Sequence, residues 1–283
     1  MKTLKSINAN KGIEMKYRKT LLQEIEKMHA SFLFWISAEY KKSPPIKIAT
    51  DSSVDNMTNM LNNLANQWQD RFADFAEFVA YKYIQQQFKQ SLDAFHSNLL
   101  DAGLKITPSL SLQGLTGVGL QNELVKMGWA VKSEMTPAML DVFNATVKAN
   151  IDLIKSIPSE YLSKVQSAVY QSYTNGKDLQ ALVENIEAIY PVTHKRAMLI
   201  ARDQTRKANA VVNRTKQLEL GFTEAIWMHS HGGKHPRPDH LHANGKRYKI
   251  SEGCLISGKY IQPGEEINCR CTSRPILPEV LSG

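Results

Sequence analysis

The sequence predicts a mainly α protein (α+β), with a long N-terminal helical arm and a helical middle followed by a small C-terminal antiparallel β module with long loops. Apolar residues recur at spacings of three and four through most of the chain before Gly221. After Gly221 the chain is rich in Gly and Pro, which is typical of turns between short strands. That stretch also holds five of the 8 histidines and all 3 cysteines. Any chemistry of the protein is therefore expected there.

The composition is that of a globular protein with a sizeable core, because 42% of the 283 residues are hydrophobic. No window approaches the roughly 18 consecutive apolar residues of a membrane span. The first residues lack the apolar run of a secretory signal, so we expect a protein made in the cytoplasm. An odd number of cysteines does not make a disulfide framework, which agrees with a reducing compartment.

The net charge of +8 is concentrated towards the C-terminus. Residues 191–283 carry 15 Lys and Arg against 8 Asp and Glu, while the preceding part is almost neutral. A local basic excess favours contact with a phosphate backbone or with an acidic protein surface. The alternative is a solvated basic face that contributes only to solubility.

The arm is predicted over residues 1–110 and contains two helices. The first spans about residues 12–42 and ends at the Ser-Pro-Pro of residues 43–45. The second opens at Asp51, a good N-cap, and runs to a stop near Gly103. Its aromatic stripe is a candidate stacking surface for single-stranded nucleic acid, but the helical spacing favours packing against another helix.

A glycine-containing linker is predicted over residues 111–135, followed by a helical region over 136–222. Within this region Pro158 and Pro191 are expected to separate one helix from the next, because proline lacks the backbone N–H that a helix interior needs. The last helix is expected over residues 193–220.

Four polar residues of that last helix, Arg202, Arg206, Asn209 and Asn213, fall on one face. This face has three interpretations, which the sequence leaves open. The first is that the face binds phosphates, and the second is that it is solvated. The third is that Arg202 is buried and paired with the C-terminal segment.

The module over residues 223–283 contains a candidate zinc site. In an extended strand residues i and i+2 face the same side, so Cys269 and Cys271 would present their sulfurs together. His240 and Cys254 would complete the four ligands of a structural zinc ion. The Cys-x-Cys spacing differs from the usual Cys-x2-Cys of zinc knuckles, so the alternative is small cysteines buried in the core.

Two enzymatic alternatives use the same segment. Asp239, His240 and Asn244 suggest a metal-dependent nuclease with a histidine base, but no histidine follows Asn244 to complete such a site. Arg270 and Arg274 would lower the pKa of a nucleophilic cysteine, yet no catalytic order of Cys and His is recognisable.

An ordered set of short motifs runs through the C-terminal half: Ala201-Arg202-Asp203-Gln204, Trp227, Arg237-Pro238-x-His240, Gly245, Pro263-Gly264 and Asn268-Cys269-Arg270-Cys271. Over about residues 150–276 this set resembles the phage head-morphogenesis family, the Mu protein F-like minor head proteins. The chain departs from the family pattern at Asp203-Gln204, where the family more often has Thr-Glu.

The resemblance implies a non-enzymatic phage minor head protein, located in the virion at the capsid interior or the portal vertex. Procapsid assembly and DNA packaging or delivery would be its roles. The expected partners are the portal protein, the major capsid protein and double-stranded DNA, with no membrane and no cofactor other than the zinc ion considered above. A metal-dependent, nuclease-like enzyme is the alternative.

The resemblance also implies structural roles for the motif residues, with Trp227 in the core and with Arg237 and His240 organising a turn. The motif residues expected to hold the module together are Arg202, Trp227, Arg237, His240, Gly245, Asn268, Cys269, Arg270 and Cys271. The basic residues expected to contact DNA or a partner are Arg206, Arg214, Lys246, Arg247 and Lys249.

Overall fold

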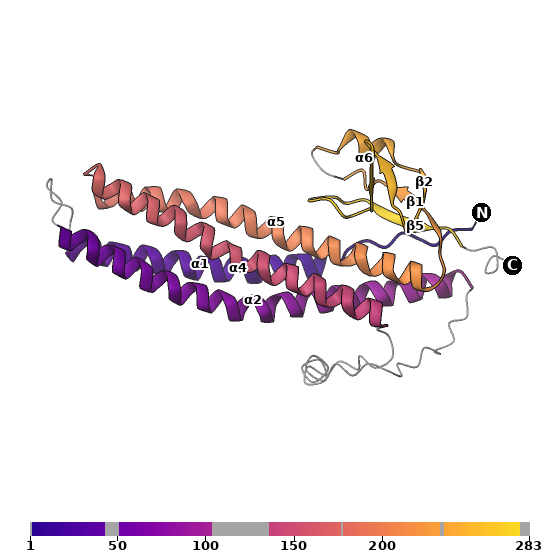
Figure 1. The fold of residues 1–283 in the computed structure, drawn as a ribbon, viewed down its shortest axis with the longest axis horizontal. Coiled ribbons are helices and arrows are strands. Elements are labelled where there is room, and N and C mark those ends of the chain that lie inside the picture. The colour runs from indigo at the N-terminus through magenta and orange to yellow at the C-terminus, as the bar shows by residue number, and fades with distance from the viewer. Residues whose placement is uncertain (1, 43–50, 104–135, 177, 233–234, 278–283) are drawn as a thin grey trace. The chain divides into compact units, whose positions relative to one another are not determined.

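The computed structural model describes residues 2–42, 51–103, 136–176, 178–232 and 235–277. Four long helices make up most of these residues. The helices are α1 (Lys11–Lys42), α2 (Asp51–Asp101), α4 (Pro137–Thr174) and α5 (Leu179–Glu219). A short helix and five short strands follow them (Figure 1). The mainly α fold class with a small C-terminal β module is therefore confirmed. The predicted linker at 111–135 lies outside the described residues.

The chain packs as two units, and each of them combines distant stretches of sequence. Unit 1 consists of Met1–Asn10, Ile84–Thr146 and Asp203–Gly283, and unit 2 consists of Lys11–Tyr83 and Val147–Arg202. The domains predicted from the sequence are consecutive stretches, whereas α2, α4 and α5 each contribute residues to both units.

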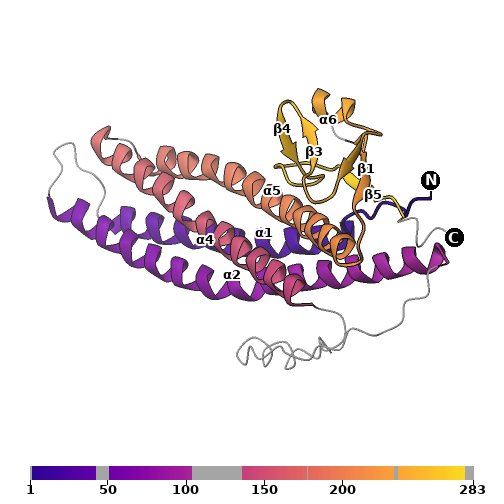
Figure 2. The same ribbon diagram turned by 45° about the vertical axis from the view of Figure 1, so that its right-hand side comes forward.

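Unit 2 is a bundle of α1 with parts of α2, α4 and α5, which lie side by side in both ribbon views (Figures 1 and 2). Its core is one cluster of buried apolar side chains, among them Leu21, Phe32, Phe72, Val165 and Ile186. These residues come from the helical stripes seen in the sequence, because a surface helix buries the face on which its apolar residues recur. The aromatic stripe of α2 contributes to this packing.

The helix breaks expected at Pro158 and Pro191 are wrong. Both prolines lie inside continuous helices, Pro158 in α4 and Pro191 in α5. The apolar stripe keeps its phase across each proline, as the buried Ile157 and Tyr161 show for the first. Burial of the continuous stripe outweighs the cost of about 3 kcal/mol that proline carries in a helix interior.

Part of the polar face of α5 is an internal layer of unit 1. The side chain of Asn209 is buried; its Oδ1 accepts a hydrogen bond from Ser91 Oγ (2.9 Å) and its Nδ2 donates to the carbonyl of Ile7 (2.9 Å). Asn213, also buried, donates to the Asn209 carbonyl at 2.7 Å. Asn209 therefore joins α5 to α2 and the N-terminal segment, and neither asparagine faces a phosphate or solvent.

The C-terminal module of unit 1 contains two small antiparallel sheets. The first has the order β2-β1-β5, formed by Arg247–Lys249, Glu224–Met228 and Thr272–Pro275. The second is the hairpin of β3 (Cys254–Ile256) and β4 (Lys259–Ile261). Helix α6 (Pro238–His242) lies between β1 and β2 in the chain.

A second apolar core holds unit 1 together. It includes Leu4 of the N-terminal segment, Phe95 of α2, and Phe222, Trp227 and Tyr248 of the C-terminal part. The N-terminal segment also pairs with the chain after β5, through an isolated bridge between Thr3 and Ile276. Within the described ranges, no helix is both long and apolar enough to cross a bilayer.

Candidate metal centre

The candidate metal site lies beside β1 and α6. These two elements place the side chains of Trp227 and His240 against each other. Side chains alternate along a strand, and the indole of Trp227 points into the core, where it is fully buried. The imidazole of His240 on α6 is 3% exposed and meets the indole edge to face, with ring centroids 5.3 Å apart. Trp227 therefore fixes one side of the histidine ring, in keeping with the core role that the resemblance implies.

The two cysteines enter from the segment before β5. A turn closed by the Cys269 N–H, which donates to the Glu266 carbonyl (2.9 Å), precedes them. Asn268 adopts a left-handed backbone there, with φ 62°, a conformation that asparagine tolerates better than most residues. Cys269 and Cys271 are then 4% and 5% exposed, and their sulfurs lie on the same side.

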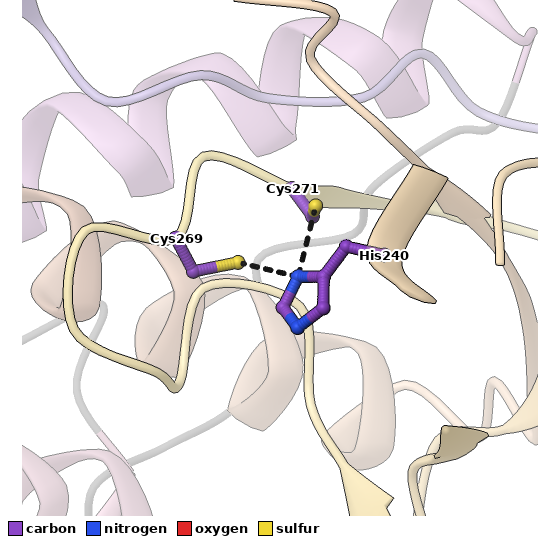
Figure 3. Close-up of side chains that lie close together, drawn as sticks. All are labelled: His240, Cys269 and Cys271. Carbon is purple, nitrogen blue, oxygen red and sulfur yellow. Dashed lines mark hydrogen bonds between the residues drawn. The ribbon is translucent and has the colours of Figure 1, made fainter. Parts of the chain in front are cut away.

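Both sulfurs face one nitrogen of His240 (Figure 3). Each Sγ lies 3.6 Å from His240 Nδ1, and the three candidate ligand atoms are all within 4.8 Å of one another. Of the four residues predicted for a zinc site, the structure thus brings three together. Cys254 on β3 is buried in the apolar core of unit 1 and is not a member of the cluster.

The other ring nitrogen of His240 faces a carboxylate that the sequence analysis did not single out. His240 Nε2 lies 3.1 Å from Glu266 Oε2, although the two atoms do not form a regular hydrogen bond. Arg237 Nη1 pairs with the same carboxylate oxygen at 3.0 Å, and Arg237 Nη2 donates to the Ile267 carbonyl. Arg237 therefore organises the turn around His240, through Glu266.

A second carboxylate anchors the cysteine segment to α5. Asp203 is buried, and its Oδ1 accepts a hydrogen bond from the backbone N–H of Asn268 at 2.8 Å. Its Oδ2 pairs with Lys207 Nζ at 3.0 Å. Sequence reasoning noted Asp203 only as a departure from the family pattern.

The two thiols are electrostatically linked. The pKa of Cys269 is lowered, chiefly by a hydrogen bond from the Cys271 side chain; burial opposes the shift, and the backbone N–H groups of Cys271 and Gly264 assist it. The pKa of Cys271 is raised, by the same hydrogen bond and by burial. Trp227 Nε1 approaches the Cys271 sulfur but does not reach hydrogen-bond geometry. One thiolate is thus already favoured, and thiolates are the form in which cysteine binds metals.

The remaining motif residues support the module or lie apart from the cluster. Gly245 has a φ of 84° and donates its N–H to the Trp227 carbonyl (2.8 Å), so it forms the turn after α6. Arg270 is exposed, and its guanidinium lies beside Gly232. A side chain at position 232 would crowd it, because a Cβ there would be 3.2 Å from Arg270 Nη1. Arg202 is half-buried and belongs to unit 2.

The basic candidates differ in accessibility. Lys246, Arg247 and Lys249 are exposed in and beside β2, while Arg206 and Arg214 on α5 are half-buried. Arg247 forms an ion pair with Glu224, and Lys249 Nζ lies 2.9 Å from Glu252.

The polar residues that suggested a nuclease have local structural contacts. Asp239 Oδ1 accepts the His240 N–H (2.8 Å), and its Oδ2 accepts the hydroxyl of Ser257 (3.1 Å). Asn244 Oδ1 accepts the N–H of His229 at 2.9 Å. These contacts shape the loops on either side of α6. His229 itself is buried at the end of β1.

Comparison with known proteins adds a family. The model of the family described as Phage Mu protein F like protein matches residues 163–274. An uncharacterized protein of Haemophilus influenzae (strain ATCC 51907 / DSM 11121 / KW20 / Rd) is 33% identical over 169 residues, which are 60% of this chain but only 35% of that protein. No solved structure matches the chain. The matched segment, residues 163–274, contains α5 and the whole His240, Cys269 and Cys271 cluster, and the match confirms the resemblance to this phage head-morphogenesis family.

Proposed function

We propose that the protein is a minor head protein of a phage, a structural component at the capsid interior or the portal vertex. In this role it takes part in procapsid assembly and in DNA packaging or delivery, with the portal protein and the major capsid protein as partners. The observation that carries the proposal is the family match over residues 163–274. The match covers 35% of the length of the relative from Haemophilus influenzae. The proposed role is therefore that of this chain in the phage head, and it is not extended to the rest of that longer protein.

The burial of the cluster supports a structural role over an enzymatic one. A nuclease must bring the scissile phosphate to its metal or its base. Here His240, Cys269 and Cys271 are 3%, 4% and 5% exposed, so a polymeric substrate has no access to their ligand atoms in this conformation. Residues buried in this way hold loops together, which suits a component of an assembly.

Removal of the protein from the encoding phage is expected to abolish DNA-filled heads. The measurement is electron microscopy of lysates from the gene deletion, with the wild-type gene supplied in trans as the control. Mass spectrometry of purified heads is expected to detect peptides of the chain. Normal yields of filled heads without the protein would contradict the proposed role.

The enzymatic alternative has a separate outcome. If the purified full-length protein cleaves DNA with a divalent ion, and His240→Ala abolishes cleavage while the circular dichroism spectrum is unchanged, the alternative is favoured.

For the contact with DNA we propose the exposed cations Lys246, Arg247 and Lys249, with the half-buried Arg206 and Arg214 of α5 as further candidates. The motivating observation is the basic C-terminal third, with 15 Lys and Arg against 8 Asp and Glu. The ion pairs of Arg247 and Lys249 are at least half exposed on the cation side. Such surface pairs are weak, so these cations can exchange an acidic partner for a phosphate at little cost.

Binding to double-stranded DNA is expected to weaken as salt rises. Replacing Lys246, Arg247 and Lys249 by glutamine should reduce the slope of log affinity against log salt by about 0.9 for each phosphate that the protein no longer neutralises. Fluorescence anisotropy with a labelled duplex measures the slope. The matched control replaces three exposed lysines of unit 2, Lys16, Lys19 and Lys164, and should leave the slope unchanged. An affinity insensitive to salt, or equal reductions of the slope in both triple variants, would contradict this assignment.

A further inference from the structure

The geometry of the cluster fits a bound metal ion. An ion held tetrahedrally at about 2.3 Å from a sulfur and about 2.0–2.1 Å from a nitrogen keeps those two atoms about 3.6 Å apart. Both sulfur-to-Nδ1 distances in the cluster are 3.6 Å. We propose that Nδ1 of His240 and the thiolates of Cys269 and Cys271 bind one zinc ion.

The donor set selects the metal. Two thiolates and one imidazole are soft and intermediate ligands, which suit zinc, whereas magnesium and calcium require oxygen ligands. The three side chains are buried, so they shield the ion that they bind from solvent. Binding converts up to two thiols to thiolates, and the released protons pass to solvent.

The surroundings of His240 supply an independent observation. A histidine that ligates a metal usually directs its other ring nitrogen at a carboxylate or a carbonyl, which fixes the orientation of the ring. Glu266 takes this place, with Oε2 at 3.1 Å from Nε2, and Arg237 Nη1 holds the same oxygen at 3.0 Å. We therefore assign Glu266 as a positioning residue that turns Nδ1 towards the sulfurs. Its carboxylate contacts the far side of the ring and not the ion.

The cluster supplies three of the four ligands of a tetrahedral site. Among the described residues, no fourth His, Cys, Asp or Glu joins the cluster. His229 is buried on the same face of β1 as Trp227, but its Nδ1 accepts the N–H of His231 (3.1 Å). The ring proton of neutral His229 then lies on Nε2, so neither of its nitrogens offers a lone pair to the ion.

The ion would join two segments that no strand pairing connects. His240 belongs to α6, and the cysteines lie in the extended segment that leads into β5. A metal bond between them closes a loop of the chain around β2, β3 and β4. Such a bond would stabilise the module whether or not the proposed head function holds.

Elemental analysis of the purified full-length protein is expected to find one zinc per chain. Replacement by cobalt(II) should give the d–d absorption of a tetrahedral site and the sulfur-to-cobalt charge transfer of two thiolates. Cys269→Ser and Cys271→Ser should lose the metal. Cys254→Ser is the matched control, because Cys254 is equally buried but outside the cluster, and it should keep one zinc per chain.

Glu266→Gln tests the site without removing a ligand. Its circular dichroism spectrum should equal that of the wild type, while chelator competition should show zinc binding about 10- to 100-fold weaker. His229→Gln should retain wild-type affinity. The proposal is overturned if the wild type contains no metal and its thiols react freely or form a disulfide. It is also overturned if Cys254→Ser or His229→Gln loses the zinc.

Discussion

Trp227→Ala is expected to lower the free energy of unfolding of unit 1 by about 3–5 kcal/mol, the range for removing a large aromatic side chain from a core. The indole is fully buried between β1 and the rest of the apolar core of unit 1. Its rings contact His240 at 5.3 Å and Tyr248 at 6.4 Å between centroids. The cavity would therefore open beside the cysteine and histidine cluster, and neighbouring side chains would lose their packing partner.

Urea denaturation followed by circular dichroism measures the change in stability, and hydrogen exchange of peptides from residues 222–277 locates it. Trp35→Ala is the matched control, because Trp35 is 48% exposed on α1. This control should cost less than about 1 kcal/mol, as surface substitutions usually do. Equal destabilisation by the two variants would show that Trp227 is not a core residue in solution.

The ends of the long helices could be predicted from the sequence because each has a local cause. Helix α2 begins at Asp51, where the sequence predicts its start, and ends at Asp101, close to Gly103 with its φ of 80°. The helix breaks predicted at Pro158 and Pro191 are wrong, because the local preference of proline against helix interiors is weaker than the burial of apolar residues along the whole helix. The unbroken phase of the apolar stripe was the better indicator at both prolines.

The cluster could be predicted only in part. The alternation of an extended chain correctly placed the sulfurs of Cys269 and Cys271 on one side. Which further residues join them depends on contacts across about 30 residues of chain, and the sequence contains no local signal for these. Cys254 and His240 therefore looked equivalent as ligands, yet only His240 reaches the sulfurs.

The polar residues illustrate the same limit. Asn209 lies on a polar face of α5, which the sequence could assign to phosphate, to solvent or to internal pairing. Its partners, Ser91 and the Ile7 carbonyl, are more than 100 residues away in the chain. A buried amide is stable only when its donors and acceptors are satisfied, and tertiary structure alone supplies these partners.

Asp203→Ala is expected to cost about 3 kcal/mol, because it removes a buried charged acceptor. The Asn268 N–H, which donates to Asp203 Oδ1 at 2.8 Å, would lose its partner. Asn268 has a φ of 62°, so the turn before the cysteines depends on a contact that fixes this backbone. Lys207 would also lose the carboxylate that it approaches at 3.0 Å.

Two further variants separate these contributions. Asp203→Asn keeps an oxygen that can accept from Asn268 and should recover most of the stability. Lys207→Gln removes the ion pair only; because the lysine side chain is 31% exposed, it should cost less than about 1 kcal/mol. Denaturation midpoints give the stabilities, and exchange of the Asn268 amide reports directly on the bond. If Lys207→Gln were as damaging as Asp203→Ala while that amide stayed protected in both variants, the ion pair and not the turn would be the source of the stability.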